Sequence, residues 1–423
     1  MLIHIIKSTD TLWGIASLYH VLPEAIMHIN QLPNPDRLLI GQALIIPTDK
    51  KYHIIQPGET MFQIAQAYGV PLPELLQINQ LHDPNYIYSG MQIIIPVNKP
   101  LIDVNAYTNT TGATAGKLVL EVGNKLTYVC PFAYIMKKDG SIEPIKDEEI
   151  LTSAVRTNVS PMMCITNFTS RDPGSQLAHI ILSNEDIQNR LLSNVINMMR
   201  AKGYQGLNID FENTYPSDRE LYNQFLQRAV DLLHRQGYYV STALAPKTSA
   251  QQQGILYEAH DYAAHGRIVD FVVLMTYEWG YRLGPPQAIS PIHQIKKVLD
   301  YAVSVIPKQK ILMGMQFYAR DWVLPHVQGK EAETFSMQEA IRRAGQYQVA
   351  IQYDQTTQSP FYRYIDEVGR HHEVWFEDAR STQAKFDMVK RYGLRGISYW
   401  VLGYPFPQNW TLLTDNFKIR KLR

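Results

Sequence analysis

Cysteine, net charge and long apolar runs are all scarce in this chain of 423 residues. The two cysteines, Cys130 and Cys164, lie in apolar strand-like runs, so we expect buried core residues rather than a disulfide or a metal site. His371 and His372 are expected in a polar turn, no Cys/His spacing is typical of zinc, and neither a metal nor a cofactor is expected.

The charge and hydropathy patterns exclude two further classes of partner. A net charge of +1 argues against nucleic acid and anionic membranes. The sequence has no run of 18 apolar residues, and Met1 leads directly into an expected strand, Leu2–Ile6. We therefore expect a soluble protein without a membrane span or an N-terminal signal peptide, acting as a monomer.

One short stretch, 206–212, alternates polar and apolar residues. This alternation predicts a strand, and its polar residues Asn208, Asp210 and Glu212 would share one face. Single acids at strand ends are often helix caps or surface charges. Two acids on one face inside an apolar run are costly to bury, which favours a functional site.

Helices are predicted on both sides of this strand. One spans about Ser183–Lys202 and stops at Gly203, and the next opens with a capping box at Ser217 and Glu220 and closes at Gly237. Strands alternate with helices from about residue 102 onward, which predicts an α/β fold, a (β/α)8 TIM barrel, over 98–423. The eight predicted barrel strands are Ile102–Ala106, Leu126–Phe132, Met162–Thr166, Leu207–Phe211, Tyr239–Leu244, Phe271–Met275, Ile311–Met315 and Gly396–Trp400.

Extra residues between the last two barrel strands predict a small α+β insertion at about 318–380. It holds a helix capped at Ser336 and Glu339. A hairpin of Phe361–Tyr364 with His372–Phe376 would turn at Glu367–Arg370. We expect the insertion to wall one side of a cleft at the carboxyl ends of the strands.

The first 96 residues are an internal repeat at an offset of 49, with expected boundaries at 1–48 and 49–97. Ile29-Asn30-Gln31-Leu32, for example, returns as Ile78-Asn79-Gln80-Leu81. Each copy predicts a strand, two helices and a strand. The short linker Val97–Leu101 predicts modules close to the barrel.

The two copies resemble LysM modules, from their His-x-Ile opening, Asp/Glu-Thr helix start and Ile-x-Ile-Pro-like close. The resemblance implies that they bind β-1,4-linked N-acetylglucosamine chains of peptidoglycan or chitin, unless one copy only packs against the barrel. The implied contact residues are Asp10, Thr11, Leu12, Pro35, Leu38 and Ile40 in the first copy, and Glu59, Thr60, Met61, Pro84 and Ile87 in the second.

The barrel sequence resembles glycoside hydrolase family 18. The stretch Gln205–Glu212 is similar to the family's D-G-x-D-x-D-x-E signature, and Ala243–Lys247, Met275–Tyr277, Gly314–Arg320 and Ser398–Trp400 match further strands. Two of the signature's aspartates are replaced, by Gln205 and Asn208. Glu278 likewise stands where an aspartate is common. Asn208 can hydrogen-bond Asp210 but cannot take a proton from it, so the tuning of the acid must differ here.

The resemblance implies a substrate-assisted mechanism. Glu212 would be the general acid/base, with its pKa raised by burial and by the charge of Asp210. Asp210 would orient the acetamido N–H of the sugar, Tyr277 would hold the acetamido carbonyl oxygen, and Asn208 would complete the catalytic group. The implied sugar-binding residues are Trp400, Tyr107, Met275, Glu278, Trp279, Gln316 and Tyr318.

The replaced aspartate and the repeated modules are most similar to the spore cortex-lytic N-acetylglucosaminidases of spore-forming bacilli. This implies endo-type cleavage of cortex peptidoglycan or its fragments during germination, by an enzyme made in the mother cell without a signal peptide and deposited in the spore coat or cortex. Two alternatives stay open: a chitinase or vegetative cell-wall hydrolase, and a non-catalytic peptidoglycan-binding coat protein.

Overall fold

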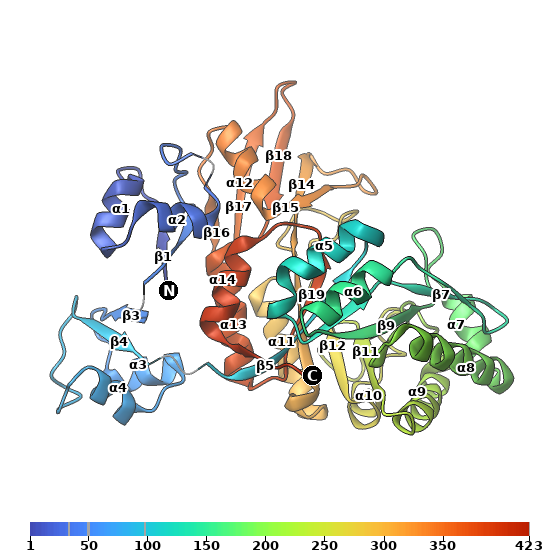
Figure 1. Cartoon of the computed structure of the whole chain (residues 1–423). Coiled ribbons are helices and arrows are strands. Elements are labelled where there is room, and N and C mark those ends of the chain that lie inside the picture. The colour runs from blue at the N-terminus through green and yellow to red at the C-terminus, as the bar shows by residue number, and fades with distance from the viewer. Residues whose placement is uncertain (33, 49–50, 97–98, 423) are drawn as a thin grey trace.

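Two small modules precede a large barrel in the computed structural model, which describes residues 1–32, 34–48, 51–96 and 99–422 (Figure 1). Val97 and Asn98 of the expected linker lie outside these residues. Residue 49, where the second module was expected to begin, lies outside them as well. Both modules have the predicted βααβ order. Their elements are β1 (Leu2–Ile5), α1 (Leu12–Tyr19), α2 (Pro23–Asn30) and β2 (Ala43–Ile46), then β3 (Lys51–Ile54), α3 (Met61–Tyr68), α4 (Leu72–Ile78) and β4 (Gln92–Ile95).

Eight parallel strands close into a barrel, which confirms the predicted TIM-barrel fold. In barrel order they are β5 (Leu101–Thr108), β6 (Tyr128–Pro131), β9 (Ser160–Thr166), β10 (Gly206–Asp210), β11 (Tyr239–Leu244), β12 (Phe271–Leu274), β13 (Ile311–Gln316) and β19 (Gly396–Leu402). The helices that follow these strands along the chain are α5 (Gly112–Val122), α6 (Glu148–Arg156), α7 (Ser175–Leu182), α8 (Glu185–Lys202), α9 (Arg219–His234), α10 (Tyr262–Ile268), α11 (Ile292–Val305), α13 (Ala379–Tyr392) and, after the last strand, α14 (Pro407–Asn416). Within the described ranges, no helix combines the length and hydropathy that a membrane span requires.

Strand β10 shows why the alternating stretch adopts this fold. Its apolar side chains point outward to the helices, and the Phe211 ring that follows stacks on Tyr222 and Phe225 of α9 at centroid distances of 5.3 and 5.6 Å. Its polar side chains point inward, among an apolar interior that includes the free, buried Cys130 and Cys164. The buried-core prediction for both cysteines is therefore confirmed.

The helix after β10 begins later than predicted. Residues Pro216–Asp218 form a 3-10 turn, and α9 starts at Arg219 with Asp218 at its N-cap. Ser217 lies inside that turn and donates to Asp218, so the predicted capping box of Ser217 and Glu220 is wrong. The fixed backbone angle of Pro216 suits the start of the tight turn, which displaces Ser217 from the cap position.

The insertion between β13 and β19 has the predicted α+β composition with one helix, but its sheet has five antiparallel strands, of which only a two-stranded hairpin was predicted. Its strands are β14 (Tyr318–Leu324), β15 (Glu333–Ser336), β16 (Gln352–Asp354), β17 (Ser359–Ile365) and β18 (His371–Trp375), and its helix is α12 (Met337–Gln346). Ser336 caps α12 as expected, since its side chain accepts from the Glu339 N–H. The predicted hairpin is confirmed as the β17–β18 pair.

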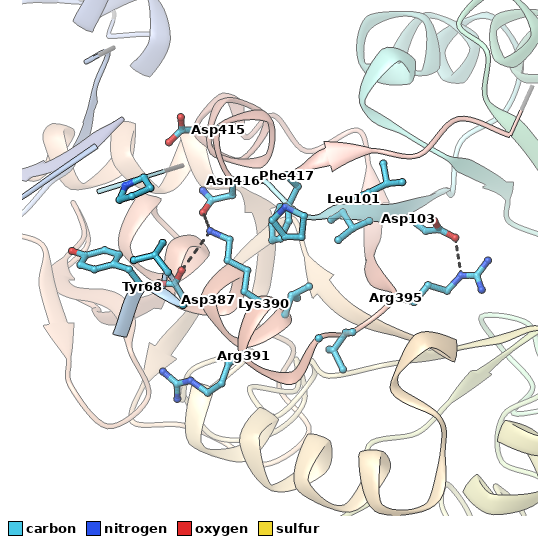
Figure 2. A pocket seen from close by; sticks show the side chains of 18 of the residues that line it. Tyr68, Leu101, Asp103, Asp387, Lys390, Arg391, Arg395, Asp415, Asn416 and Phe417 are labelled. Carbon is cyan, nitrogen blue, oxygen red and sulfur yellow. Dashed lines mark hydrogen bonds and ion pairs between the residues drawn. The ribbon is translucent and has the colours of Figure 1, made fainter. Parts of the chain in front are cut away.

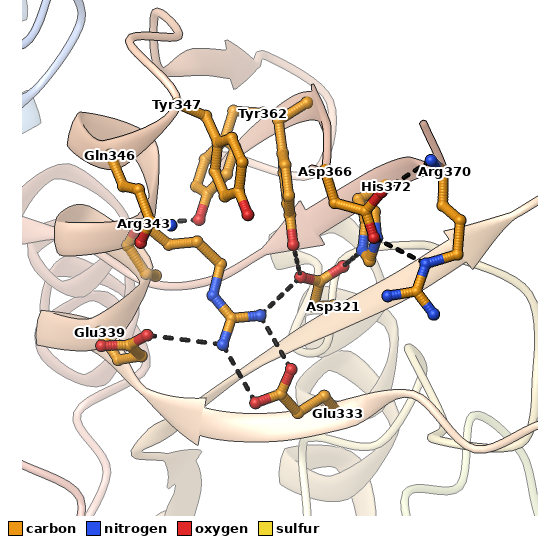
Figure 3. Close-up of polar contacts among 12 residues, drawn as sticks. Asp321, Glu333, Glu339, Arg343, Gln346, Tyr347, Tyr362, Asp366, Arg370 and His372 are labelled. Atoms are coloured by element: carbon orange, nitrogen blue, oxygen red, sulfur yellow. Dashed lines mark hydrogen bonds and ion pairs between the residues drawn. The ribbon is translucent and has the colours of Figure 1, made fainter. Parts of the chain in front are cut away.

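A buried polar cluster holds the insertion together (Figure 3). Asp321 accepts hydrogen bonds from Arg343 at 2.7 Å, the Tyr364 hydroxyl at 2.5 Å and His372 Nδ1 at 2.7 Å. The other ring nitrogen of His372 lies 3.3 Å from Asp366. The prediction of a polar turn at His371 and His372 is therefore wrong, because both residues belong to β18 and His372 is buried between two carboxylates.

Candidate active site

The carboxyl ends of the barrel strands surround a cavity of about 230 Å³. Asp210 ends β10 and Glu212 follows it by two residues, so one segment brings both carboxyl groups to the cavity. The full lining is Tyr107, Phe132, Phe168, Asp210, Glu212, Ala243, Ala245, Pro246, Leu256, Val273, Met275, Tyr277, Glu278 and Trp400. The site therefore combines three carboxyl groups with a mostly apolar and aromatic wall, as small-ligand sites commonly do.

Burial and neighbouring carboxylate charge raise the pKa values of both members of the carboxyl pair. Burial, together with the charge of Glu278, raises the pKa of Glu212 to about 7. Burial and the charge of Glu212 raise the pKa of Asp210 well above its ordinary value. The sequence predicted Asp210 as the charge acting on Glu212, whereas in the structure that charge is Glu278 from the next-but-one strand end, and the charge of Glu212 acts on Asp210. One oxygen of Asp210, Oδ1, is buried without a hydrogen-bond partner among the described residues.

Two side chains that the sequence reading missed hold the backbone of this segment. Asn167, which follows β9, accepts from the Glu212 N–H at 2.9 Å and donates to the Glu212 carbonyl at 2.8 Å. His260 accepts from the Ala245 N–H at 2.9 Å through Nδ1, which leaves Nε2 to donate to the Phe211 carbonyl at 2.8 Å. Both contacts join residues more than ten positions apart, so no local pattern in the sequence indicates them.

Glu278 is held in place from the insertion. It has a positive φ of 72°, and the Tyr318 hydroxyl donates to its carboxylate. Arg320, which is 4% exposed, donates to both Glu278 oxygens, at 2.8 and 3.0 Å. The insertion strand β14 thus positions a charge beside Glu212.

Asn208 does not bond Asp210, so that expectation is wrong. Its Oδ1 accepts from the Tyr107 hydroxyl at 3.0 Å, and its Nδ2 donates to Ser241 Oγ at 2.9 Å. Side chains two residues apart on a strand are separated by about 6.6 Å along it, while neighbouring strands lie about 4.8 Å away. Ser241, on the adjacent strand β11, is therefore nearer than Asp210, and the Tyr107 hydroxyl reaches Asn208 across the barrel interior from β5.

Aromatic rings form one wall of the cavity. The Trp400 ring lies 5.6 Å from Tyr107 and 4.9 Å from Phe132 between centroids, and Phe168 lies 5.9 Å beyond Phe132. Phe132 and Phe168 were not predicted as site residues. Such a wall suits the apolar face of a sugar ring.

The cavity includes most but not all of the barrel residues predicted for the site. Those that line it are Asp210, Glu212, Tyr277, Tyr107, Met275, Glu278 and Trp400. Asn208 and Gln316 are 1% and 2% exposed, Gln316 being bonded to Ser290 and Glu377. Tyr318 lies behind Glu278, and the Trp279 ring packs against the main core. Direct contact with a ligand therefore stays a prediction for the seven lining residues, and the other four could influence a ligand only through them.

The predicted LysM contact residues divide into surface and core positions. Leu12 and Met61 are each 1% exposed and belong to the cores of their modules, so only their backbones could touch a ligand. Asp10 and Glu59 accept from His4 and His53 at 2.9 and 2.7 Å. Thr11 and Thr60 cap α1 and α3, Leu38 and Ile87 pack partly buried on the module cores, and Ile40 is exposed; Pro35 and Pro84 lie half-buried in the second loops.

A larger space of about 1150 Å³ lies between the second module and the amino ends of the barrel strands (Figure 2). Several of its charges are paired, among them Asp103 with Arg395 at 2.7 Å and Lys390 with Asp387 at 4.0 Å. Active sites of such barrels occur at the opposite end. This space is therefore a gap between module and barrel rather than the active site.

Comparison with known proteins assigns this sequence to a family. The model described as Glycosyl hydrolases family 18 matches residues 107–404, and the LysM domain model matches residues 4–47 and 53–96. The cortical fragment-lytic enzyme of Bacillus subtilis (strain 168) is 52% identical, over 100% of this chain and 99% of that protein. The same-named enzyme of Bacillus anthracis is 46% identical, over 98% of each chain.

Solved structures agree with the sequence comparison. The crystal structure of the Bacillus cereus spore cortex-lytic enzyme SleL superimposes with a TM-score of 0.91 at 42% identity, covering 99% of this chain and 98% of that one. The similarity thus extends over the modules as well as the barrel.

Proposed function

This chain belongs to glycosyl hydrolase family 18 and carries two LysM domains, and from that premise we propose that it is a retaining, substrate-assisted N-acetylglucosaminidase acting on spore-cortex peptidoglycan or its fragments. It is a glycosidase by family. The substrate class is inferred from relatives named for cortical fragments and the spore cortex. The site of action would accordingly be the spore cortex, with the LysM domains holding glycan strands.

The observation that carries the proposal is the buried carboxyl pair of Asp210 and Glu212. Two carboxyl groups that flank a glycosidic bond in ordinary retaining enzymes are about 5 Å apart on opposite sides of the sugar. Here both project from one segment into one cavity, so they cannot lie on opposite sides of a sugar. If the substrate itself supplies the nucleophile, no carboxylate is needed on the opposite side of the sugar, and members of this family use such a substrate-assisted mechanism.

In the first step, the acetamido carbonyl oxygen of the −1 sugar attacks C1 as Glu212 protonates the departing glycosidic oxygen. A pKa of about 7 keeps that proton available near neutral pH. The unpartnered Oδ1 of Asp210 would accept the acetamido N–H, and the Tyr277 hydroxyl would donate to the acetamido oxygen. Trp400 would support the ring.

In the second step, ionised Glu212 takes a proton from water as the water attacks C1 and opens the oxazolinium ring. Glu212 is thereby reprotonated, and two displacements at C1 retain the configuration. The −1 sugar must carry a free 2-acetamido group. Muramic-δ-lactam has its nitrogen tied into a ring and cannot supply one, so we infer cleavage after N-acetylglucosamine.

The test is product analysis by mass spectrometry after borohydride reduction of digested cortex fragments. Reduced N-acetylglucosamine ends from wild type, and none from Glu212→Gln, are expected. Muramic-type ends would contradict the bond assignment. Activity on chitin oligomers but not on cortex fragments would favour a chitinase. Binding without any new ends would favour a coat protein without catalytic activity.

A further inference from the structure

The two LysM domains offer an internal comparison, since they share one backbone design. His4 contacts Tyr19 at 3.0 Å in the first, and His53 contacts Tyr68 at 3.1 Å in the second. The second loops also match. The Asp36 N–H donates to Asn34 Oδ1 at 2.8 Å, as the Asn85 N–H donates to Asp83 Oδ1 at 2.8 Å. Differences in their surfaces therefore reflect side chains and surroundings rather than fold.

The first domain has one sheet face buried on the barrel. Strand β2 alternates, with Leu44 and Ile46 in the core of the domain, and Ala43 and Ile45 in the main barrel core. Gln408 of α14 donates to the Ala43 carbonyl at 2.9 Å. The first domain lies beside the insertion and α14 in Figure 1. It is therefore a fixed part of the catalytic unit.

The insertion occupies the end of the second loop of this domain. The Ile351 N–H donates to the Ile40 carbonyl at 2.9 Å, and Arg380 donates to the Gly41 carbonyl at 3.0 Å. Leu39 packs against the main core and lies next to Gly345. Part of the surface that a glycan could use is thus committed to contacts within the chain.

The equivalent positions of the second domain face solvent. At the offset of 49, Ile5 corresponds to Ile54, which is 54% exposed, and Ile29 corresponds to Ile78, which is 41% exposed. Leu39 corresponds to Tyr88, which is 68% exposed. The contacts that fix the first domain are made at positions that the second domain leaves open.

The second domain also presents more aromatic side chains. Ile87 packs on the domain core and so anchors the loop between two outward-facing tyrosines, Tyr86 at 80% exposure and Tyr88. Phe62, 64% exposed, follows the buried Met61 at the start of α3. The first domain retains Trp13, 63% exposed, at the position of Phe62, but has Arg37 at the position of Tyr86.

We infer that the second LysM domain, through Phe62, Tyr86 and Tyr88, is the one that holds the N-acetylglucosamine-containing glycan, while the first serves mainly as a docked part of the catalytic unit. This assignment rests on the proposed function and deepens it. Exposed aromatic rings in a loop held by backbone hydrogen bonds supply stacking area for sugar rings with little ordering cost. The segment 83–90 carries one formal charge, on Asp83, which suits a neutral glycan.

The test measures binding of full-length variants to purified, insoluble cortex peptidoglycan, in a Glu212→Gln background so that the glycan is not cut. Tyr86→Ala with Tyr88→Ala is expected to weaken binding about tenfold, the scale of losing aromatic anchors. The matched variant Arg37→Ala is expected to change it by less than about twofold, as for a peripheral contact. Phe62→Ala paired with Trp13→Ala tests the remaining aromatic position in the same way.

Because these side chains are more than half exposed, or polar surface residues, their truncation should leave the fold intact, which a circular dichroism melt checks. Equal or larger losses from the first-domain variants would overturn the assignment, as would binding that none of the variants weakens. Turnover of a short soluble chitooligosaccharide, measured with Glu212 present, should be unchanged by all of them. If that turnover is absent but the ranking of binding holds, the enzyme proposal fails and the assignment of the second domain survives.

Discussion

Two carboxyl groups two residues apart in a buried cavity cannot both be ionised without a large free-energy cost. In this site the pKa values of Asp210 and Glu212 are both raised, so the pair avoids this cost by retaining a proton near neutral pH. The third carboxylate, Glu278, stays close to its cation Arg320. In the proposed mechanism these carboxyl groups have separate roles: Glu212 is the proton donor, Asp210 accepts the substrate N–H, and Glu278 is a neighbouring charge held by Arg320.

The first prediction concerns pH. Glu212 must be protonated to act as an acid, so kcat/KM is expected to fall as pH rises through about 7. The charge of Glu278 raises the pKa of Glu212, so Glu278→Gln should lower that pKa and move the alkaline limb to lower pH. The measurement is the pH profile of kcat/KM on a soluble fragment.

A matched control for this profile is Glu331→Gln, which removes an exposed carboxylate paired with Arg282. Its profile should match that of the wild type. An alkaline limb that does not move in Glu278→Gln would show that Glu278 does not tune the acid.

At the scale of elements, the site depends on how strand ends are tied together. Asn167 and His260 bond the backbone at Glu212 and Phe211 from the segments after β9 and β11. Neither acts on a ligand directly. Both fix where the carboxyl groups point, which matters because small misplacements of reacting groups reduce rates strongly.

The second prediction tests this backbone clamp. Asn167→Ala leaves two partly buried backbone groups of Glu212 unpaired, so the free energy of unfolding should fall by about 1–3 kcal/mol. Because the acid also loses its position, kcat should fall by about 10- to 100-fold with little change in KM. Urea melts and steady-state kinetics measure the two effects.

The control is Asn184→Ala, which removes the cap of α8, where Asn184 accepts from the Ile187 N–H at 3.0 Å. It should lose about 1 kcal/mol of stability and keep its kcat. If both variants lost activity in proportion to stability, Asn167 would have only a structural role.

The sequence predicted those features that depend on neighbouring residues. Alternation located β10 and its inward carboxyl groups, and the repeat located both modules. It did not predict the Asn208 bonds, the Asn167 clamp or the buried state of His372, because these depend on which distant segments the closed fold brings together. The late start of α9 was missed because the 3-10 turn at Pro216 and an α-helical cap look alike in sequence.

At the scale of the whole molecule, the docking of the first LysM domain joins it to the catalytic barrel. Gly41 is the tightest point of this contact, since a Cβ there would lie 1.9 Å from the Ile351 carbonyl oxygen. Its counterpart in the second domain, Gly90, has a similar φ, +87° against +81°, and open space around it. Substituting each of the two glycines in turn therefore distinguishes the effect of backbone strain, which both share, from the effect of lost docking, which only Gly41 can show.

The third prediction uses this pair. Gly41→Ala and Gly90→Ala should each lose about 1–2 kcal/mol locally from the left-handed backbone. Only Gly41→Ala should also release the first domain, seen as a lower melting temperature of the barrel by calorimetry and faster protease cleavage near residue 48. Equal effects of the two substitutions would contradict the docking account.

The central claim, that the substrate supplies the nucleophile, is tested most directly by proton NMR of the first product. The substrates are matched glycan fragments with and without the acetyl group on the −1 sugar. We predict that the acetylated fragment is cleaved with the β-anomer appearing first, and that the deacetylated fragment is left intact. Initial appearance of the α-anomer, or comparable cleavage of both fragments, would contradict the account.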